Sequence, residues 1–240
     1  MANRLYHNCL ITCEHAGNRV PEAYGHLFRG AEEILKSHRG WDPGAIRAAE
    51  IIAAKFGAPM IDYPWTRLLI EPNRSNGHRQ LFSEFTRFLP ENEKENLINQ
   101  YYLPYRQRVE TKLKSMLLNG NRVVHISVHT FTPELNGVVR NADAGLLYDP
   151  ARAEEKEFCL RLKKHLLQEA PRFKIRMNYP YLGSSDGFTT ALRKTFSNES
   201  YLGIELEINQ KWLDAERKIW TEISNHLASG LKKVFSFAIQ

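Results

Sequence analysis

Short apolar segments alternate along the chain with longer segments of helical periodicity. The apolar segments are four to eight residues long and bounded by turn residues, which is typical of buried strands. They are Cys9–Cys13, Pro59–Tyr63, Arg67–Glu71, Arg122–His129, Lys174–Met177 and Tyr201–Ile208. Because strands separated by helices usually lie parallel with helices on both faces, the pattern predicts an α/β fold with a largely parallel sheet.

Helical segments lie between these strands. Asp42 is a typical N-cap and Pro43 a typical first helical residue, so a helix is predicted from there to about Lys55. A long helical stretch runs from Glu91 to Leu118, and Pro104 should kink or break it. The other predicted helices are Ala151–Gln168, Asp186–Thr195 and a C-terminal helix from Trp212 to about Phe235.

Composition places the chain among ordinary globular proteins. Hydrophobic residues make up 42% and charged residues 25% of its 240 residues, which is enough chain to bury the core of one domain. No repeat, low-complexity segment or linker interrupts the pattern. We therefore predict a single domain over residues 1–240.

The charge of the chain and its cysteines indicate which binding partners and which cellular compartment to expect. The net charge is +6, but the basic residues are scattered, which favours a small anionic ligand over a nucleic acid. No segment has the length of a membrane span or the pattern of a signal peptide. The three cysteines form no CxxC pair, which is typical of a reducing compartment, so we expect a cytoplasmic protein without a membrane partner.

Two predicted strands carry polar side chains on one face, although a buried parallel strand should be apolar on both. Because side chains alternate along a strand, His125, Ser127 and His129 lie together on one face of the strand Arg122–His129. The same alternation places together Glu205, Glu207 and Asn209 on the second of these strands. Either these are edge strands with a solvated face, or their carboxyl ends direct His129 and Glu207 into a shared site.

The predicted strand Cys9–Cys13 leads into Glu14 and His15, and Gly17 and Asn18 follow after one alanine. Ligands of open α/β sheets bind beyond the carboxyl ends of the strands. A carboxylate and an imidazole at this place can ligate a metal or move protons. Cys13 could act as a nucleophile beside His15, but a small buried strand residue is the simpler interpretation.

Three further segments have both a structural and a functional interpretation. Asp42 caps its helix or ligates a metal. Arg67 and the segment Glu71–Arg74 are ordinary surface residues or hold a carboxylate, because the planar fork of arginine binds carboxylates bidentately. The segment Asn178–Gly183 is an ordinary turn or a loop that covers a site. No GxSxG, P-loop or GxGxxG motif is found.

Taken together, these segments resemble the N-formylglutamate amidohydrolase family. They follow the order of the family and span nearly the whole chain. They are Cys13–Asn18 with Pro21, Gly40–Ala45, Arg67 with Glu71–Arg74, Val128–Thr130 with Pro133, Asn178–Gly183 and Glu207–Gln210. The resemblance implies a fold like that of zinc carboxypeptidases and aspartoacylases. This is a three-layer α/β/α sandwich with a mixed, mostly parallel central sheet of the phosphorylase/hydrolase-like kind.

The resemblance also implies a zinc site. His15 and His129 would ligate the ion, since neutral imidazoles suit zinc. A third, carboxylate ligand is expected, and relatives in the wider fold take it three residues after the first histidine, where this chain has Asn18. Asp42 is our first choice for this ligand. Glu14 is the second, or else a group that orients an imidazole.

The remaining roles follow from the same resemblance. Glu207 resembles the general base, and Arg67, Asn73 and Arg74 resemble a clamp for the substrate carboxylate, with Tyr181 in the loop nearby. The implied activity is zinc-dependent cleavage of the amide C–N bond of a small acidic N-acyl amino acid such as N-formyl-glutamate, with a link to histidine degradation. The alternatives are a carboxypeptidase or peptidoglycan-peptide amidase on the same fold, and a non-catalytic module that binds an acidic ligand.

Overall fold

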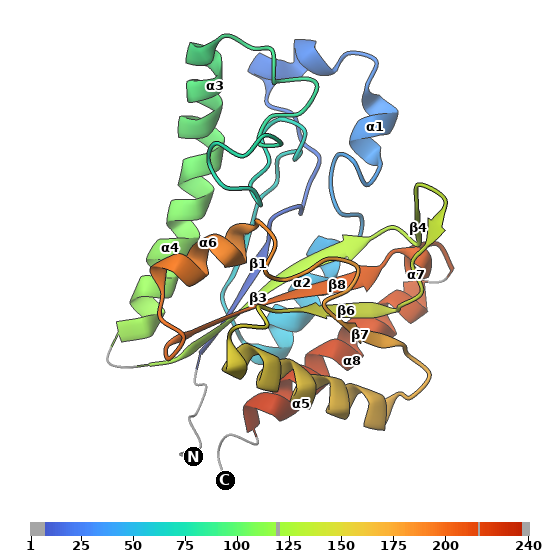
Figure 1. The fold of residues 1–240 in the computed structure, drawn as a ribbon. Coiled ribbons are helices and arrows are strands. Elements are labelled where there is room, and N and C mark those ends of the chain that lie inside the picture. Colours follow the sequence, from blue (N-terminus) through green and yellow to red (C-terminus); the bar gives the residue numbers. More distant parts are fainter. Residues whose placement is uncertain (1–7, 119–120, 216, 237–240) are drawn as a thin grey trace.

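A mixed sheet of six strands runs through the molecule (Figure 1). The computed structural model describes residues 8–118, 121–215 and 217–236. In spatial order the strands are β2 (Met60–Asp62), β1 (Asn8–Cys13), β3 (Val123–Phe131), β8 (Tyr201–Asn209), β6 (Ala144–Leu147) and β7 (Ile175–Met177). The first four run parallel, and β6 and β7 run in the opposite direction, antiparallel to β8. The prediction of a mixed, mostly parallel sheet is confirmed.

Helices cover both faces of the sheet, which confirms the predicted three-layer sandwich. One face packs against α2 (Ala45–Phe56), α5 (Ala153–Glu169) and α8 (Arg217–Ser236), with α7 (Lys211–Ala215) preceding α8. The other face packs against α4 (Leu103–Leu117) and α6 (Phe188–Thr195). None of the helices in the described ranges is both long and apolar enough to cross a bilayer.

Shorter elements form an upper region in Figure 1. The helical elements there are the 3-10 helix η1 (Glu22–Phe28), α1 (Glu32–Lys36), α3 (Glu91–Leu97) and the π-helix η2 (Ile98–Tyr102). A hairpin of β4 (Glu134–Leu135) and β5 (Val138–Val139) follows β3. Phe28, Leu69 and Leu97 belong to a separate apolar cluster that forms the hydrophobic core of this region, called the upper cluster below.

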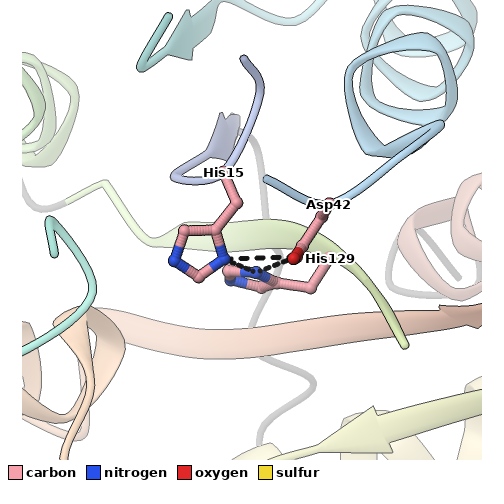
Figure 2. A group of neighbouring side chains, drawn as sticks. All are labelled: His15, Asp42 and His129. Atoms are coloured by element: carbon pink, nitrogen blue, oxygen red, sulfur yellow. Dashed lines mark hydrogen bonds and ion pairs between the residues drawn. The ribbon is translucent and has the colours of Figure 1, made fainter. Parts of the chain in front are cut away.

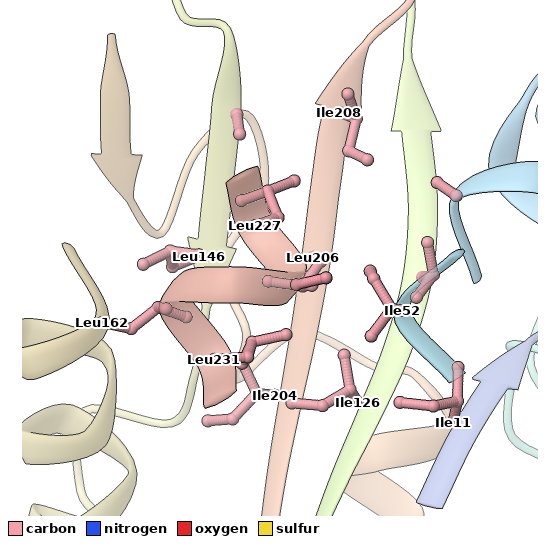
Figure 3. Close-up of a cluster of buried hydrophobic side chains, with 14 of the residues drawn as sticks. Ile11, Ile52, Ile126, Leu146, Leu162, Ile204, Leu206, Ile208, Leu227 and Leu231 are labelled. Atoms are coloured by element: carbon pink, nitrogen blue, oxygen red, sulfur yellow. The ribbon is translucent and has the colours of Figure 1, made fainter. Parts of the chain in front are cut away.

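The main hydrophobic core lies between the sheet and α2, α5 and α8. Figure 3 shows branched aliphatic side chains of neighbouring strands, among them Ile11, Ile126 and Ile204, facing helix residues such as Ile52 and Leu231. All of these side chains are fully buried. Because complete burial of one such side chain contributes about 1.5–3 kcal/mol, this face anchors the sheet.

The strands β3 and β8 are central and are buried along their whole length. The interpretation of these two segments as edge strands with a solvated face is therefore wrong. Their register pairs Ser127 with Glu205 and His129 with Glu207. The polar face is thus enclosed within the protein, where unpaired polar groups are costly.

Several predicted elements differ from the structure. Arg67–Glu71 forms turns instead of a strand, because its apolar side chains pack into the upper cluster and find no partner strand. The sequence does not predict the strand β6, since its Ala144 and Gly145 lack strand propensity.

The predicted helices also differ in detail from the structure. Pro104 falls in the first turn of α4, directly after the π-helix η2, where its missing N–H is tolerated. The predicted C-terminal helix corresponds to α7 and α8.

Candidate active site and metal centre

Three predicted ligand side chains meet beyond the carboxyl ends of β1 and β3. His15 follows β1, Asp42 precedes α2, and His129 lies near the end of β3. The Oδ2 atom of Asp42 lies 3.2 Å from Nδ1 of His15 and 3.1 Å from Nδ1 of His129. The two Nδ1 atoms are themselves 3.2 Å apart (Figure 2). All three residues are buried.

Asp42 reaches this cluster because helix α2 begins later than predicted. The helix starts at Ala45, and its N-cap Gly44 has φ +84°, a left-handed conformation that favours glycine. A Cβ on Gly44 would also lie 2.5 Å from the Leu213 side chain. The carboxylate of Asp42 makes no capping bond and accepts instead from the backbone N–H of Thr130 at 3.3 Å. The interpretation of Asp42 as a helix cap is therefore wrong.

Each histidine binds a carboxylate through its other ring nitrogen. Nε2 of His15 lies 2.6 Å from Oε1 of Glu71. Nε2 of His129 lies 2.9 Å from Oγ of Ser127 and 3.3 Å from Oε2 of Glu14. Because carboxylates accept hydrogen bonds, Nε2 carries the proton in the neutral form of each ring, and in that form the Nδ1 lone pair points into the cluster.

The cluster therefore presents two imidazole lone pairs and a carboxylate oxygen to one point. Three lone-pair atoms this close to one another repel unless a cation or a proton lies between them, and together they form a possible metal site. Zinc with bonds of 2.0–2.1 Å in tetrahedral geometry holds its ligand atoms about 3.3 Å apart, close to the separations observed. Two histidines and one carboxylate are a common ligand set of catalytic zinc. The residues present fit a zinc ion.

Electrostatics favours the ionised carboxylates around this cluster. Burial opposes ionisation of Asp42, but His15, His129 and Arg67 outweigh it and hold the pKa of Asp42 below its ordinary range. Glu71 shows the same balance, since Arg67 and His15 lower the pKa of its carboxyl against the effect of burial. Both carboxyl groups are therefore ionised near neutral pH, as a carboxylate ligand of a metal must be.

Glu14 and Asn18 do not join the cluster. Glu14 is fully buried behind His129, where Oε1 accepts from the hydroxyl of Tyr105 at 2.9 Å and Oε2 accepts from Ser127 at 2.5 Å. It faces Nε2 of His129, so it can orient the ring and fix its tautomer. The amide of Asn18 donates to the carbonyl of Leu35 at 3.0 Å and ties down the chain after the site.

Glu207 lies on β8 directly beside His129 and lines the pocket in front of the cluster. Its Oε2 atom is buried and has no hydrogen-bond partner within the described part of the chain. Burial raises the pKa of Glu207 to about 8, with Asp42 and Glu205 adding to the rise. A carboxyl group that can hold a proton near neutral pH is suited to general acid–base chemistry.

The pocket has a volume of about 280 Å³, which suits a small ligand. It is lined by all four residues predicted to bind substrate: Arg67, Asn73, Arg74 and Tyr181. Arg67 is already paired, with Nη2 2.6 Å from Oε2 of Glu71 and Nη1 3.3 Å from Oδ1 of Asp42. Its charge therefore balances these two buried carboxylates.

Asn73 and Arg74 are held by the segment that begins α6. Oδ1 of Asn73 accepts from the backbone N–H of Phe188 at 2.7 Å. Arg74 donates to the main-chain carbonyl of Asp186. Both side chains therefore have a fixed position beside the pocket, as a clamp for an anion requires.

The loop before α6 forms one wall of the pocket through Tyr181, Leu182, Ser185 and Asp186. It lies against β6 so closely that a Cβ on Gly145 would be 1.7 Å from the carbonyl oxygen of Tyr179. Of the two interpretations of this segment, the structure matches a loop that covers a site.

Sequence reasoning missed the roles of two residues, Glu71 behind His15 and Arg140 in the pocket. Glu71 was noticed only within the clamp motif, and its contact with His15 depends on tertiary packing that no local pattern reveals. Arg140 follows the Asn136–Gly137 turn and was not singled out, because a lone arginine carries no signal.

Comparisons with known proteins show the family and the fold of this chain. The model of the N-formylglutamate amidohydrolase family matches residues 7–213. The structure of gene product Atu2144 from Agrobacterium tumefaciens has 27% identity and a TM-score of 0.81, with 97% of this chain and 92% of that chain covered. The N-formylglutamate amidohydrolase from Ralstonia eutropha JMP134 has 15% identity and a TM-score of 0.68, covering 98% and 96%, which shows a shared fold. No curated protein matches the chain.

Proposed function

This chain belongs to the N-formylglutamate amidohydrolase family, and from that premise we propose that it is a zinc-dependent hydrolase of small acidic N-acyl amino acids such as N-formyl-glutamate. The reaction is hydrolysis of the amide C–N bond. The proposal rests mainly on the convergence of three ligand atoms next to Glu207, whose buried Oε2 has no hydrogen-bond partner in the described ranges. An acidic ligand or partner alone would not require this arrangement.

His15, Asp42 and His129 would hold the zinc ion. When bound, zinc supplies a Lewis acid that polarises the scissile carbonyl and makes water a better nucleophile near neutral pH. Glu71 and Glu14 keep the two imidazoles in the tautomer that leaves Nδ1 free to ligate. The first contribution of the protein is therefore a rigid set of ligands.

Glu207 moves the proton. Glu207 lines the pocket, and its Oε2 has no hydrogen-bond partner among the described residues, so this carboxylate can accept a proton from the attacking water. It then delivers that proton to the nitrogen of the leaving amine as the C–N bond breaks. Proton transfer by a positioned side chain typically contributes a factor of about 10²–10⁴ in rate.

Arg74 and Asn73 bind the carboxylate of the substrate and so orient its amide. Arginine offers a planar pair of donors to a carboxylate. Because both side chains are fixed to the start of α6, the amide is held in one orientation relative to Glu207. Such positioning is a major source of rate enhancement.

The proposed function extends to the cellular location of the protein and to the pathway in which it acts. We infer a cytoplasmic enzyme, because the three cysteines are free, buried thiols of the kind found in reducing compartments. A role in histidine degradation rests on the family resemblance alone.

Formate release from N-formyl-L-glutamate tests the proposed function. The purified protein is assayed as zinc-loaded enzyme, after removal of the metal by a chelator, and after zinc is returned. We expect activity to disappear on chelation and to return with zinc. Short peptides and peptidoglycan stem peptides are assayed in parallel. Their preferential cleavage would favour the peptidase alternatives, and the absence of any hydrolysis would favour a binding module.

A further inference from the structure

Arg140 differs from Arg67 of the same pocket because no carboxylate lies within ion-pair distance of it in the described residues. It follows the hairpin of β4 and β5 and lines the pocket. Its Nη2 donates to the hydroxyl of Tyr181 at 3.1 Å, and its Nη1 donates to Oγ1 of Thr132 at 3.4 Å. The guanidinium carbon lies 5.2 Å from the centre of the Tyr181 ring. These contacts hold the side chain in place without neutralising its charge.

The other arginines of the pocket provide the comparison. Arg67 forms ion pairs with both Asp42 and Glu71, so its charge is compensated within the protein. Arg74 donates to a main-chain carbonyl and, like Arg140, has no ion pair with a carboxylate in the described ranges. The pocket therefore contains two arginines without an ion pair to a carboxylate in the described ranges, one more than a single substrate carboxylate requires.

Arg74 and Arg140, the two arginines without an ion pair, come from different parts of the chain. Arg74 lies in the segment after β2 and contacts Asp186, whereas Arg140 lies after β5 and contacts Tyr181. Both contacted residues belong to the loop that forms one wall of the pocket. The same loop thus fixes two separate positions for an anion. Because guanidinium groups bind carboxylates through two parallel hydrogen bonds, each position suits one carboxylate.

We propose that Arg140 binds the side-chain carboxylate of the substrate and makes the enzyme select N-acyl amino acids with an acidic side chain. The proposal rests on the proposed function, and it assigns to Arg74 the α-carboxylate that all N-acyl amino acids share. Tyr181 positions Arg140 through its hydroxyl group and its ring. Arg140 is therefore a specificity-determining residue, separate from the residues that carry the reaction.

The test compares N-formyl-L-glutamate with N-formyl-L-glutamine, which has nearly the same shape but no side-chain charge. The quantity measured is the ratio of kcat/KM for the two substrates on zinc-loaded enzyme. We expect Arg140→Met to lower this ratio roughly 10–100-fold, as expected for loss of a charge-assisted hydrogen bond pair. Arg140→Lys should keep part of the preference, because the charge remains.

Arg74→Met is the matched control, since it removes the same side chain at the other anion position. It should lower kcat/KM for both substrates and keep their ratio. Melting temperatures of all three variants verify that they fold. An unchanged ratio in Arg140→Met, or a ratio that falls in Arg74→Met instead, would overturn the proposal.

Calorimetric binding of L-glutamate and L-glutamine to the zinc-loaded protein separates this proposal from the proposed function. We expect L-glutamate to bind more tightly, and Arg140→Met to abolish the difference. If N-formyl-L-glutamate is not hydrolysed but this difference depends on Arg140, the proposed function fails and the assignment of Arg140 stands. If hydrolysis occurs but neither preference depends on Arg140, the assignment fails and the proposed function stands.

Discussion

The two faces of strands β3 and β8 have the same backbone and opposite chemistry. On one face, residues such as Ile126 and Leu206 pack against α2, α5 and α8 in an apolar core. On the other, Ser127, His129 and Glu207 are just as buried but polar. Apolar burial stabilises the fold, whereas buried charges contribute little net stability and are costly when a partner is missing. The comparison indicates that the second face is kept for chemistry.

Glu207→Gln should give the largest effect, and it belongs to the polar face alone. Glutamine keeps the size of the side chain but cannot accept the proton, so we expect turnover of N-formyl-L-glutamate to fall by roughly 10²–10⁴-fold. Formate release measures this fall, and the melting temperature should not decrease. Near-normal turnover in this variant would remove the general base from the mechanism.

Ile126→Ala examines the opposite face of the same strand. The side chain is fully buried, so we expect the free energy of unfolding to fall by about 2–5 kcal/mol. Zinc content and turnover per folded molecule should stay the same, because the polar face is not altered. Urea unfolding together with metal analysis makes this measurement. Loss of zinc without loss of stability would show that the faces are not separate.

Glu71→Gln tests whether the carboxylate behind His15 supports the metal site. A glutamine can no longer act as a charged acceptor for Nε2 of His15, and loss of such a partner typically weakens metal affinity about 10–100-fold. Competition with a chromophoric chelator measures the affinity. Glu84→Gln is the control, since Glu84 pairs with Arg39 on the surface. Equal affinities in both variants would argue against the supporting role.

Cys13→Ala should have the smallest effect. The thiol is fully buried in the apolar core, and burial raises its pKa well above the ordinary value, so it is a poor nucleophile. We expect a loss of about 1 kcal/mol in unfolding free energy and no change in formate release. A variant that folds but no longer turns over would return Cys13 to the list of catalytic candidates.

The sequence predicts the two faces of β3 and β8 well, because alternation of side chains along a strand is a local property. It predicts Asp42 less well. The Asp-Pro pair is a strong local signal for a helix start, but the left-handed Gly44 moves that start to Ala45 and frees the carboxylate. Local sequence signals thus fail to predict a helix start that is set by tertiary packing.

Contacts between distant segments cannot be predicted from the chain by these rules. The pairing of Glu71 with His15 and the placement of Arg140 beside Tyr181 each join segments that are far apart in sequence. The segment Arg67–Glu71 has strand composition, but its apolar side chains pack in the upper cluster. The family resemblance supplied the mixed sheet, which periodicity alone would have made parallel.

Metal content is the measurement that tests the central claim most directly. Wild-type protein, Glu207→Gln and His129→Ala are loaded with zinc, freed of excess ion and analysed by mass spectrometry of the metal. We expect about one zinc ion per chain in the wild type and in Glu207→Gln, and almost none in His129→Ala, because only the last variant loses a ligand. Equal zinc in all three proteins, or none in the wild type, would contradict a metal centre on the polar face.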